Sequence, residues 1–353
     1  MVLKRVQLHN FRNIVSNVFD ISPNLTIILG ENAKGKTNIL ESIHCIINGT
    51  GFRESKEEEL LLMDSVETQL DGLFEKNNET NHFRILLNKE SNGSIVKHFF
   101  VQKVRKGHAN YTNEQTKCVL FAPEQIELIT GSPDIRRDYF NKLISTFDIV
   151  YKKHLTNYEQ ALRKRNKLLE HFHSAASLRE ELTFWDIYME KEAEYIVKKR
   201  TIYSQFLNSH REIEGRNFSI EYIKNEFTQK RLQEKKELEL RIRRTLIGPQ
   251  KDDWIIYLQN DNSPEKNIQK YGSRSEQRLG IFWLKMNEIR FMEENINIHP
   301  ILLLDDVFSE FDHENKERIV RLIKMHQTVM TTTEDDLVKE IQKKHKESVV
   351  IKI

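Results

Sequence analysis

The alternation of apolar and polar positions predicts that the chain begins as an α/β domain. Residues 2–8 alternate as a half-buried strand does, and the run "LTIILG" at residues 25–30 is a short β-branched segment that ends on glycine. Apolar residues then recur at helical spacing through residues 39–47. Between about residues 69 and 104, short alternating runs are separated by Asn, Gly and Ser, which predicts an antiparallel sheet with tight turns.

The middle of the chain has a different pattern. Gly and Pro almost vanish from residues 134–246, and long stretches there carry apolar residues at three- and four-residue steps, which predicts a helical insert. The run at residues 229–244 is so rich in charge that we expect a partly exposed helix. The last third returns to short apolar strands, in "HPILLLDD" at residues 299–306 and "QTVMTTT" at residues 327–333.

This organisation predicts two structural parts. We expect residues 1–123 and 245–353 to form an α/β head with mixed and antiparallel sheets, and residues 124–244 to form a helical arm inserted into it. A chain of 353 residues is long enough for one large domain or two ordinary domains with apolar cores.

The composition argues against several classes of protein. Apolar residues make up 38% of the chain and charged residues 31%, and no apolar run approaches the roughly 20 residues that span a bilayer, so we expect no membrane partner. The N-terminus lacks the apolar centre of a signal peptide. The two isolated cysteines, Cys45 and Cys118, favour a reducing cytoplasm and predict no zinc site. Because the net charge is only +2, any charge that binds DNA must be local.

The sequence "GENAKGKTN" at residues 30–38 predicts a phosphate-binding loop between a strand and a helix. Gly30 and Gly35 permit backbone conformations that turn N–H groups toward phosphate oxygens, and the following helix adds its N-terminal dipole. Lys36 is expected to bridge the β- and γ-phosphates, and the Thr37 hydroxyl to ligate Mg²⁺. The predicted nucleotide-binding residues of the loop are Gly30, Glu31, Asn32, Ala33, Lys34, Gly35, Lys36 and Thr37.

A pair of carboxylates reduces the number of protein classes that are compatible with such a phosphate-binding loop. Asp305 and Asp306 follow four apolar residues, so Asp305 can hold Mg²⁺ through water, and Asp306 is a candidate general base or polariser of the attacking water. A solvated acidic turn is the other interpretation of such a run. Here the segment "SEFD" at residues 309–312 follows directly, and a phosphate loop lies earlier in the chain.

Ser273 in "YGSRSEQ" is a predicted helix N-cap, because a helical pattern follows from Leu279. An ordinary cap is the more common interpretation of such a stretch taken alone, although a capped N-terminus is also an anion site. The order of phosphate loop, serine-capped helix, paired carboxylates, acidic turn and threonine-rich strand is that of ABC-type ATPases. In those enzymes the capped helix of one subunit closes on the nucleotide of the other. We therefore predict an ABC-type P-loop ATPase head that binds ATP and dimerises to complete its site.

The chain resembles the RecF family of bacterial recombination mediators, which are relatives of the SMC and Rad50 heads. The gap of 269 between the residue numbers of Lys36 and Asp305 is too short for the long coiled coil of an SMC or Rad50 protein, and neither cysteine could build a CxxC hook. The matching stretches are "LHNFRNI" at residues 8–14, "GENAKGKTN", "FAPEQIELITGSPDIRRDYFN" at 121–141, "GPQKDD" at 248–253, "GSRSEQ" at 272–277, "ILLLDDVFSEFD" at 301–312 and "TTTE" at 331–334.

The resemblance implies both an activity and a set of partners. It implies a weak, DNA-stimulated ATPase that acts as a switch. It also implies ATP-dependent binding of single-stranded and duplex DNA at gaps, without sequence specificity, and help in loading recombinase during replication, repair and the SOS response. The implied partners are proteins like RecO and RecR, and the implied location is the cytoplasm, at the nucleoid.

The resemblance also implies roles for individual residues. Arg12 and Asn13 would lie beside the nucleotide, and Ser273 would touch the nucleotide of the partner subunit. Lys36, Asp306 and Ser273 would together form the catalytic set.

Two departures from the family pattern bear on this activity. Relatives more often read S-R-G-Q-Q from Ser273 onward, whereas this chain has Ser275 and Glu276 at the third and fourth positions. Ser275 adds a Cβ where the backbone approaches phosphate, and Glu276 adds a negative charge, so we infer weaker ATP-driven dimerisation. Asp306 is shorter than the Glu of many ABC ATPases, which suggests slow hydrolysis.

Positive charge gathers locally in the predicted arm. Residues 151–170 hold six basic and two acidic side chains, and residues 198–200 and 241–244 add more. Such groups can contact phosphates without reading sequence, although a solvated helix face is the other interpretation of each cluster. The candidate DNA contacts are Lys152, Lys153, Arg163, Lys164 and Arg165.

Two other functions remain possible from the sequence. An SMC-like structural or regulatory ATPase whose main partner is protein would share the same motifs. A P-loop kinase acting on a small molecule fits the phosphate loop, but it has no need of "SEFD" or of the capped helix.

Overall fold

The computed structural model describes residues 1–54, 56–171, 175–213, 215–259, 264–307, 321–345 and 347–353. These residues form two compact units, one of residues 1–123 with 292–353 and the other of residues 124–291. The first boundary coincides with the predicted end of the head segment, but the second lies at residue 291 rather than at 244. The reason is that β10 (Arg216–Ile223) pairs with β11 (Asp253–Gln259), which keeps the segment after residue 244 in the second unit.

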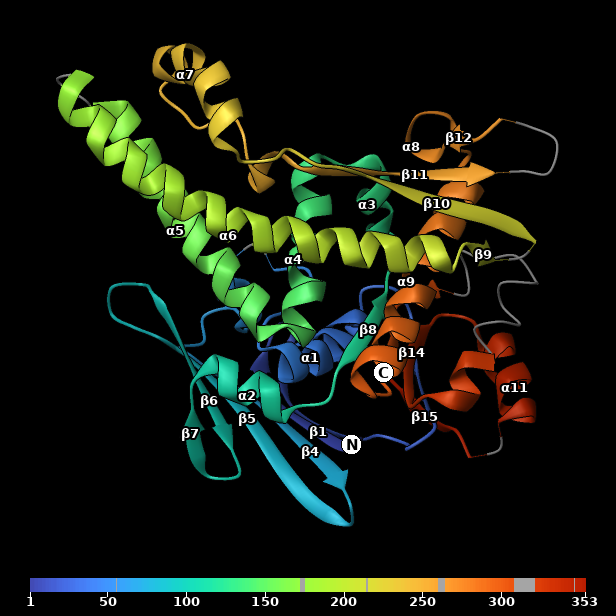
Figure 1. The fold of residues 1–353 in the computed structure, drawn as a ribbon. Helices are drawn as coiled ribbons and strands as arrows, with labels where there is room; N and C mark the ends of the chain where they lie inside the picture. Colours follow the sequence, from blue (N-terminus) through green and yellow to red (C-terminus); the bar gives the residue numbers. More distant parts are fainter. Residues whose placement is uncertain (55, 172–174, 214, 260–263, 308–320, 346) are drawn as a thin grey trace. The chain divides into compact units, whose positions relative to one another are not determined.

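The first unit contains an antiparallel sheet with the strand order β2-β1-β4-β5-β6-β7 (Figure 1). The alternation predicted at the N-terminus and between residues 69 and 104 is confirmed. Asn77 and Asn78 join β4 to β5 with φ angles of 53° and 63°, the left-handed values that a two-residue hairpin turn requires. The strands are β1 Val2–Phe11, β2 Ile14–Asp20, β4 Glu67–Lys76, β5 Glu79–Lys89, β6 Ile95–Val101 and β7 Val104–Lys106.

A parallel sheet with the strand order β15-β3-β14-β13-β8 forms the other layer of the first unit. Every residue of β3, β13 and β14 is buried, as expected for parallel strands that are covered on both faces. The two strands predicted in the last third are β13 and β14. The bounds are β3 Leu25–Leu29, β8 Cys118–Phe121, β13 Ile301–Leu304, β14 Thr328–Thr332 and β15 Val349–Lys352.

Helix α1 (Lys36–Asn48) packs its apolar side chains between these two sheets. Ile39 and Ile43 of α1 belong to one buried cluster with Leu70 of β4 and Leu303 of β13. Each such side chain contributes about 1.5–3 kcal/mol when it is removed from water. The core therefore holds the start of α1 against the ends of the parallel strands. The remaining elements of this unit are η1 Glu57–Leu60, α2 His108–Glu114 and α11 Asp335–Lys344.

The second unit contains the long helices that the sequence predicts. α5 and α6 pack side by side in Figure 1, and α6 also contacts α4 and α7. The charged run at residues 229–244 is the helix α7, as expected. The helices are α3 Glu127–Thr130, α4 Pro133–Phe147, α5 Ile149–His171, α6 Ala175–Ser209, α7 Gln229–Ile242, α8 Ile268–Tyr271 and α9 Arg274–Ile296, with the short turns η2 Pro123–Ile126 and η3 Pro249–Lys251.

The prediction of an entirely helical arm is wrong. A second antiparallel sheet, in the order β12-β11-β10-β9, crosses the predicted end of the arm at residue 244. Its strand β10 lies inside the segment predicted to be helical, and it is paired along its whole length with β11. The partner strand follows only after α7, so the pairing is long-range. The alternation of Phe218, Ile220 and Tyr222 with polar residues was a local signal of this strand, and it was overlooked. The two short strands are β9 Glu212–Ile213 and β12 Lys266–Asn267.

Two of the stretches that carry the resemblance meet inside the second unit. Arg136 of "GSPDIRR" makes two parallel contacts with Asp253 of "GPQKDD", with Nε–Oδ1 at 2.6 Å and Nη2–Oδ2 at 2.9 Å. The neighbouring Asp252 accepts from Arg200 at 2.6 Å, and both side chains are almost fully buried. Bidentate arginine–carboxylate pairs hold a fixed geometry, and removing one partner of a buried pair is strongly destabilising. These motifs therefore secure the fold of this unit.

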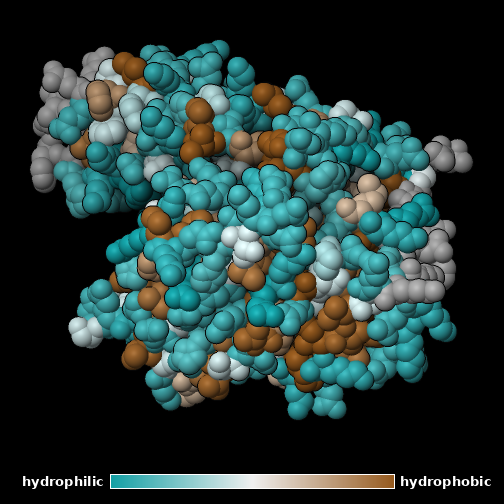
Figure 2. Space-filling model, turned by 90° about the horizontal axis from the view of Figure 1, so that it is seen from below, coloured by the Kyte–Doolittle hydropathy of each residue, from teal (hydrophilic) through white to brown (hydrophobic). Residues whose placement is uncertain are grey.

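Most of the face drawn in Figure 2 is hydrophilic, and the hydrophobic residues on it form separate patches. Among the described residues, no helix is both long and apolar enough to cross a bilayer.

Gly248, in the turn that leads into "GPQKDD", provides a test of the packing in the second unit. Its φ is +118°, and a Cβ at this position would lie 2.1 Å from the Tyr158 hydroxyl oxygen. We expect Gly248→Ala to lower the free energy of unfolding by about 3 kcal/mol, since it combines overpacking with a left-handed backbone. Urea denaturation measures the change.

Gly93→Ala is the matched control, because Gly93 has φ +84° but no atom within 4 Å of the added Cβ. It should lower stability by about 1 kcal/mol, the cost of the backbone conformation alone. An equal loss in both variants would contradict the packing account.

Candidate nucleotide site and nucleic-acid interface

The predicted phosphate loop joins the end of β3 to the start of α1, as the sequence indicates. Gly35 has φ +99°, and Ala33 also takes a left-handed conformation, with φ +65°. Helix α1 then begins at Lys36, so its unpaired N–H groups open toward the loop. Residues 31–34 are exposed. This backbone is suited to a phosphate group.

Gly30 serves the loop differently from the sequence-based expectation. Its φ is not in the left-handed region. A Cβ at this position would instead lie 2.7 Å from the carbonyl oxygen of Ile353, which follows β15. Glycine is required here because a neighbouring strand passes close by, and only Gly35 has the positive φ that was expected of both glycines.

The side chain of Lys36 is already directed at the loop. Its Nζ donates to the carbonyl oxygens of Gly30 and Glu31, both at 2.8 Å. Lys36 is buried to 7% exposure, so the ammonium group is held at the inner edge of the loop. An anion bound by the loop would exchange these carbonyl partners for phosphate oxygens.

Three polar side chains from three elements converge beside the loop. The Thr37 hydroxyl donates to Oδ1 of Asp305 at 3.0 Å, and the Thr331 hydroxyl donates to the same oxygen at 2.8 Å. Asp305 is 5% exposed. The contact joins the N-terminus of α1 to the ends of β13 and β14. It confirms that Thr37 and Asp305 lie together, and it adds Thr331, which the sequence analysis had placed only within a threonine-rich strand.

Asp306 occupies a constrained turn after β13. Its backbone N–H donates to Thr331 Oγ1 at 2.9 Å, and its φ is +48°. Aspartate tolerates this left-handed region better than most residues do. Thr331 therefore contacts both residues of the pair, Asp305 through its carboxylate and Asp306 through its backbone N–H. The "SEFD" segment at residues 309–312 lies outside the described residues.

Arg12, which follows β1, belongs to a charge cluster around the buried Glu41 of α1. Its Nε donates to Glu41 at 2.9 Å, and Arg53 contacts the same carboxylate at 2.9 Å. Glu41 is fully buried, which by itself would raise its pKa, but the two guanidinium groups outweigh burial and lower the pKa below 4.5. Glu41 and Arg53 were missed by the sequence analysis, although a charged residue within the apolar run of α1 was a usable signal.

Asn13 lies beside the phosphate loop. Its Oδ1 accepts from Asn38 Nδ2 at 2.7 Å, and a Cβ on Gly35 would lie 2.9 Å from its amide atoms. A surface pocket adjoins this position and contains both residues that were predicted to flank the nucleotide. The residues that line the pocket are Arg12, Asn13, Asn38, Arg53, Glu59, Leu61 and Met63.

In the second unit, Ser273 caps α9 as predicted. Its hydroxyl accepts from the N–H of Glu276 at 3.3 Å, and the Glu276 carboxylate accepts from the N–H of Ser273 at 2.7 Å. This reciprocal pair is a capping box. Lys266 also donates to Glu276 at 2.5 Å, and these partners lower the pKa of Glu276 against the effect of burial. The negative charge of Glu276 is thus paired with a cation.

The five candidate DNA contacts do not share one environment. Arg165 is 3% exposed and binds Asp186 at 2.7 Å and Glu239 at 2.8 Å, so the prediction is wrong for this residue, which ties α5 to α6 and α7. Lys153, Arg163 and Lys164 are exposed, and Lys152 is partly so.

Aromatic side chains lie on the arm beside these cations. Lys164 Nζ lies 4.9 Å from the ring centroid of Trp185, and the neighbouring Phe184 is 60% exposed. We would expect aromatic residues of the arm to pack in its core, but the exposed side chain of Phe184 does not.

The first unit defines the class of this protein. Its parallel sheet, the phosphate loop before α1 and the carboxylate after β13 form the head of an ABC-type ATPase, and a second unit is inserted into it. An SMC head domain from Pyrococcus furiosus is 15% identical, with a TM-score of 0.52 over 96% of this chain and 91% of that one, which supports the fold alone. No family model matches the sequence.

Full-length relatives identify the family. The DNA replication and repair protein RecF of Lactococcus lactis subsp. cremoris is 33% identical over 351 residues, covering 97% of this chain and 95% of the relative. RecF of Agathobacter rectalis is 30% identical over 343 residues, covering 94% and 92%. The chain belongs to the RecF family.

A solved structure agrees with this assignment. The structure of the recombination mediator protein RecF with ATP, in the RecFOR pathway, matches this chain with a TM-score of 0.84 and 27% identity. The match covers 95% of this chain and 92% of that one.

The Glu41 cluster predicts a pH-dependent stability. Because the pKa of Glu41 is lowered in the fold, its contribution is present above about pH 4.5 and is lost as the pH falls through the lowered folded value. We expect Glu41→Gln to lower the free energy of unfolding at pH 7 by about 3 kcal/mol, since it unbalances a buried ion pair. The difference from the unsubstituted protein should shrink in denaturation measured below pH 4.5.

Glu79→Gln, at an exposed position, is the control and should have little effect at either pH. A Glu41→Gln difference that does not change with pH would show that packing, and not the charge of Glu41, stabilises α1.

Proposed function

We propose that this chain is an ATP-dependent, DNA-binding recombination mediator. The observation that carries the proposal is the convergence of Thr37, Asp305 and Thr331 beside the phosphate loop. A phosphate-binding loop alone occurs in many classes of nucleotide-binding protein. The carboxylate of Asp305, which follows β13 and lies beside Thr37, is suited to nucleotide hydrolysis. The similarity to a RecF–ATP complex supports ATP as the nucleotide.

The loop would bind the triphosphate through its backbone N–H groups and Lys36. The side-chain oxygens of Thr37 and Asp305, 3.0 Å apart, are the hard ligands that Mg²⁺ prefers, so these two residues would hold that ion. When bound, Mg²⁺ would neutralise charge that develops on the phosphate oxygens. Arg12 and Asn13, which line the adjoining pocket, would contact the nucleoside part of ATP.

Hydrolysis would be slow and suited to a switch. Asp306 is the candidate for orienting or deprotonating the attacking water. Its side chain is one methylene shorter than glutamate, and its backbone is held by Thr331, so it has limited freedom to approach the γ-phosphate. A weak ATPase that DNA stimulates is the activity we propose.

A second copy of the chain would complete the site through the N-terminus of α9. The capping box of Ser273 and Glu276 defines this terminus, and Lys266 offsets the charge of Glu276. Of the two residues that depart from the family pattern at this terminus, Ser275 therefore stands as the stronger reason for a weak ATP-dependent dimer, because no contact among the described residues compensates its Cβ as Lys266 compensates the charge of Glu276.

The exposed cations of α5 would contact DNA phosphates without reading sequence, on single strands as well as duplexes. Trp185 and Phe184 next to Lys164 add surfaces on which unpaired bases can stack. This pairing favours a junction between single-stranded and duplex DNA. Proteins like RecO and RecR are the proposed partners, because the RecF–ATP structure belongs to a RecFOR pathway. We expect the protein in the cytoplasm, at the nucleoid.

The other function that the motifs allow is an SMC-like regulatory ATPase whose partner is protein. DNA binding by the purified chain, measured with and without ATP, separates the two proposals.

Lys36→Ala tests the nucleotide site. We expect it to weaken ATP binding about tenfold or more, because a charge-assisted hydrogen bond to phosphate is worth about 1.5–3 kcal/mol. It should also remove any ATP-dependent dimer. Titration with a fluorescent ATP analogue measures the first effect, and sedimentation with and without ATP measures the second.

Lys34→Ala is the control, because Lys34 is an exposed lysine of the same loop. It should bind ATP nearly as well as the unsubstituted protein. Equal losses in both variants would contradict the assignment of Lys36, and a tight ATP-dependent dimer of the unsubstituted protein would contradict the weak dimer.

Charge reversal on α5 tests the DNA interface. We expect Arg163→Glu with Lys164→Glu to weaken binding to a gapped duplex. If both residues contact duplex phosphates, the slope of log K against log salt should fall in magnitude by about 1.8. Fluorescence anisotropy at several salt concentrations, with ATP present, measures both quantities.

The control is the double variant Lys103→Glu with Arg105→Glu, which changes the net charge by the same amount at exposed positions outside the arm. It should keep most of the affinity for DNA. If the α5 variant binds DNA as tightly as the unsubstituted protein, Arg163 and Lys164 are solvated surface residues and do not contact DNA.

A further inference from the structure

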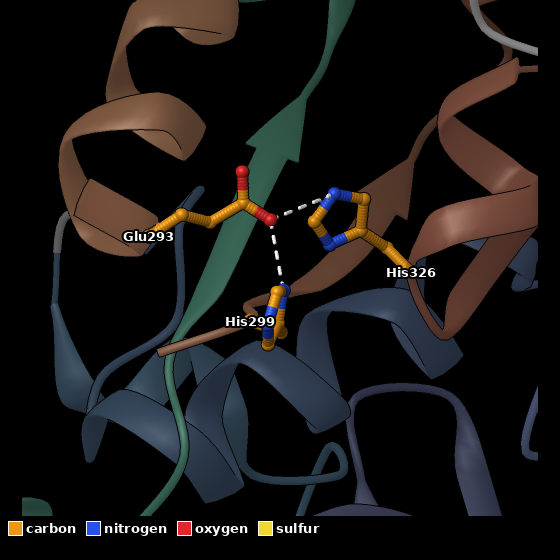
Figure 3. A group of neighbouring side chains, drawn as sticks. All are labelled: Glu293, His299 and His326. Atoms are coloured by element: carbon orange, nitrogen blue, oxygen red, sulfur yellow. Dashed lines mark hydrogen bonds and ion pairs between the residues drawn. The ribbon is translucent and has the colours of Figure 1, made fainter. Parts of the chain in front are cut away.

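Three potential metal ligands converge in the first unit, away from the phosphate loop. Glu293 comes from the last turns of α9, His299 precedes β13, and His326 precedes β14. Figure 3 shows the three side chains directed toward one another from these separate segments. They are not adjacent in sequence, so only the fold brings them together.

The distances within this cluster suit a metal ion. The carboxylate oxygen of Glu293 lies 2.8 Å from Nδ1 of His299 and 3.4 Å from Nε2 of His326. All three residues can offer ligand atoms within 4.8 Å of one another. Nitrogen and oxygen ligands about 2.0–2.2 Å from a tetrahedral Zn²⁺ lie roughly 3.3 Å from each other, so small side-chain movements would suffice.

His326 provides an independent reason to expect a ligand. Its side chain is 1% exposed, and its buried Nδ1 has no hydrogen-bond partner among the residues that the structure describes. Buried polar atoms are nearly always paired, because an unpaired one loses its bonds to water without compensation. With its proton on Nε2, the neutral imidazole presents the Nδ1 lone pair to an ion. Figure 3 shows both ring nitrogens on the side of the ring that faces Glu293 and His299.

We propose that Glu293, His299 and His326 form a binding site for a transition-metal ion of the Zn²⁺ class. Two imidazoles and one carboxylate suit Zn²⁺ and its neighbours, whereas Mg²⁺ and Ca²⁺ prefer ligands made only of oxygen. His299 is 72% exposed, so an ion can enter from solvent and keep a water as its fourth ligand.

The place of this site in the fold indicates its effect. His299 and His326 lie just before β13 and β14, and the far ends of the same strands carry Asp305 and Thr331. An ion would join the end of α9 to the starts of both strands. It would act as a structural clamp on the sheet that carries the carboxylates, separate from the nucleotide. The absence of paired cysteines in the sequence does not bear on such a site, since none of its ligands is a thiolate.

Zinc binding by the full chain tests this inference. The metal-free protein is titrated with Zn²⁺ in competition with a chromophoric chelator, and thermal unfolding is followed with Zn²⁺ or with EDTA. We expect one ion bound to this site per chain and a higher melting temperature with Zn²⁺. The His299→Ala variant should bind Zn²⁺ at least about tenfold more weakly. A loss of about tenfold is already typical when a residue that only hydrogen-bonds to a metal ligand is removed, so removal of a ligand itself should cost no less.

His299 is a suitable residue to change, because an exposed side chain can be removed without disturbing the core. Glu293→Gln should also weaken zinc binding and abolish the rise in melting temperature, while melting in EDTA stays close to that of the unsubstituted protein.

His9→Ala, an exposed histidine on β1, is the control and should bind Zn²⁺ as the unsubstituted protein does. Equal zinc affinity in the His299→Ala and His9→Ala variants, or no bound zinc in the unsubstituted protein, would overturn the proposal. The cluster would then be a hydrogen-bonded brace only.

Discussion

The two hydrogen bonds that Asp305 accepts from Thr37 and Thr331 are the interaction on which the site depends. They link the first turn of α1 with the carboxyl ends of β13 and β14. This contact is possible because β14 lies between β3 and β13 in the parallel sheet. The apolar side chains between α1 and the strands hold these elements in place. The buried carboxylate of Asp305, with its two hydroxyl donors, then fixes the positions of the side chains in the site.

The second unit is held together by a different kind of interaction. Its buried charges are paired within the unit, with Arg136 on Asp253 and Arg200 on Asp252. Each of these arginines depends on its particular carboxylate, because an unpaired buried charge is expensive. The same physics removes Arg165 from the candidate DNA contacts. A run of basic residues in the sequence does not show which side chains face water and which are buried in ion pairs.

Local patterns predicted much of the fold and part of the site. The strands around "LTIILG" and "ILLLDD", the helix after the phosphate loop and the cap at Ser273 all follow from short-range periodicity and capping chemistry, and all are present. The strand β10 was missed although Phe218, Ile220 and Tyr222 alternate with polar residues, because the segments on both sides are helical and the partner strand lies beyond α7. Glu41 and Arg53 were missed because the pairing of Glu41 with Arg12 and Arg53 depends on how β1 and the segment after α1 approach the helix. Such contacts leave no mark at fixed spacing.

By itself, the sequence determined the class of the protein, the order of its elements and the identity of the phosphate loop, because these depend on neighbouring residues and on spacing. Only the tertiary structure decided which charges are paired and which are free to bind. It placed Asp305 between two threonines, gave Glu276 a lysine partner and brought Glu293, His299 and His326 together. Each of these outcomes joins side chains from separate elements, and their approach is set by packing of the whole unit.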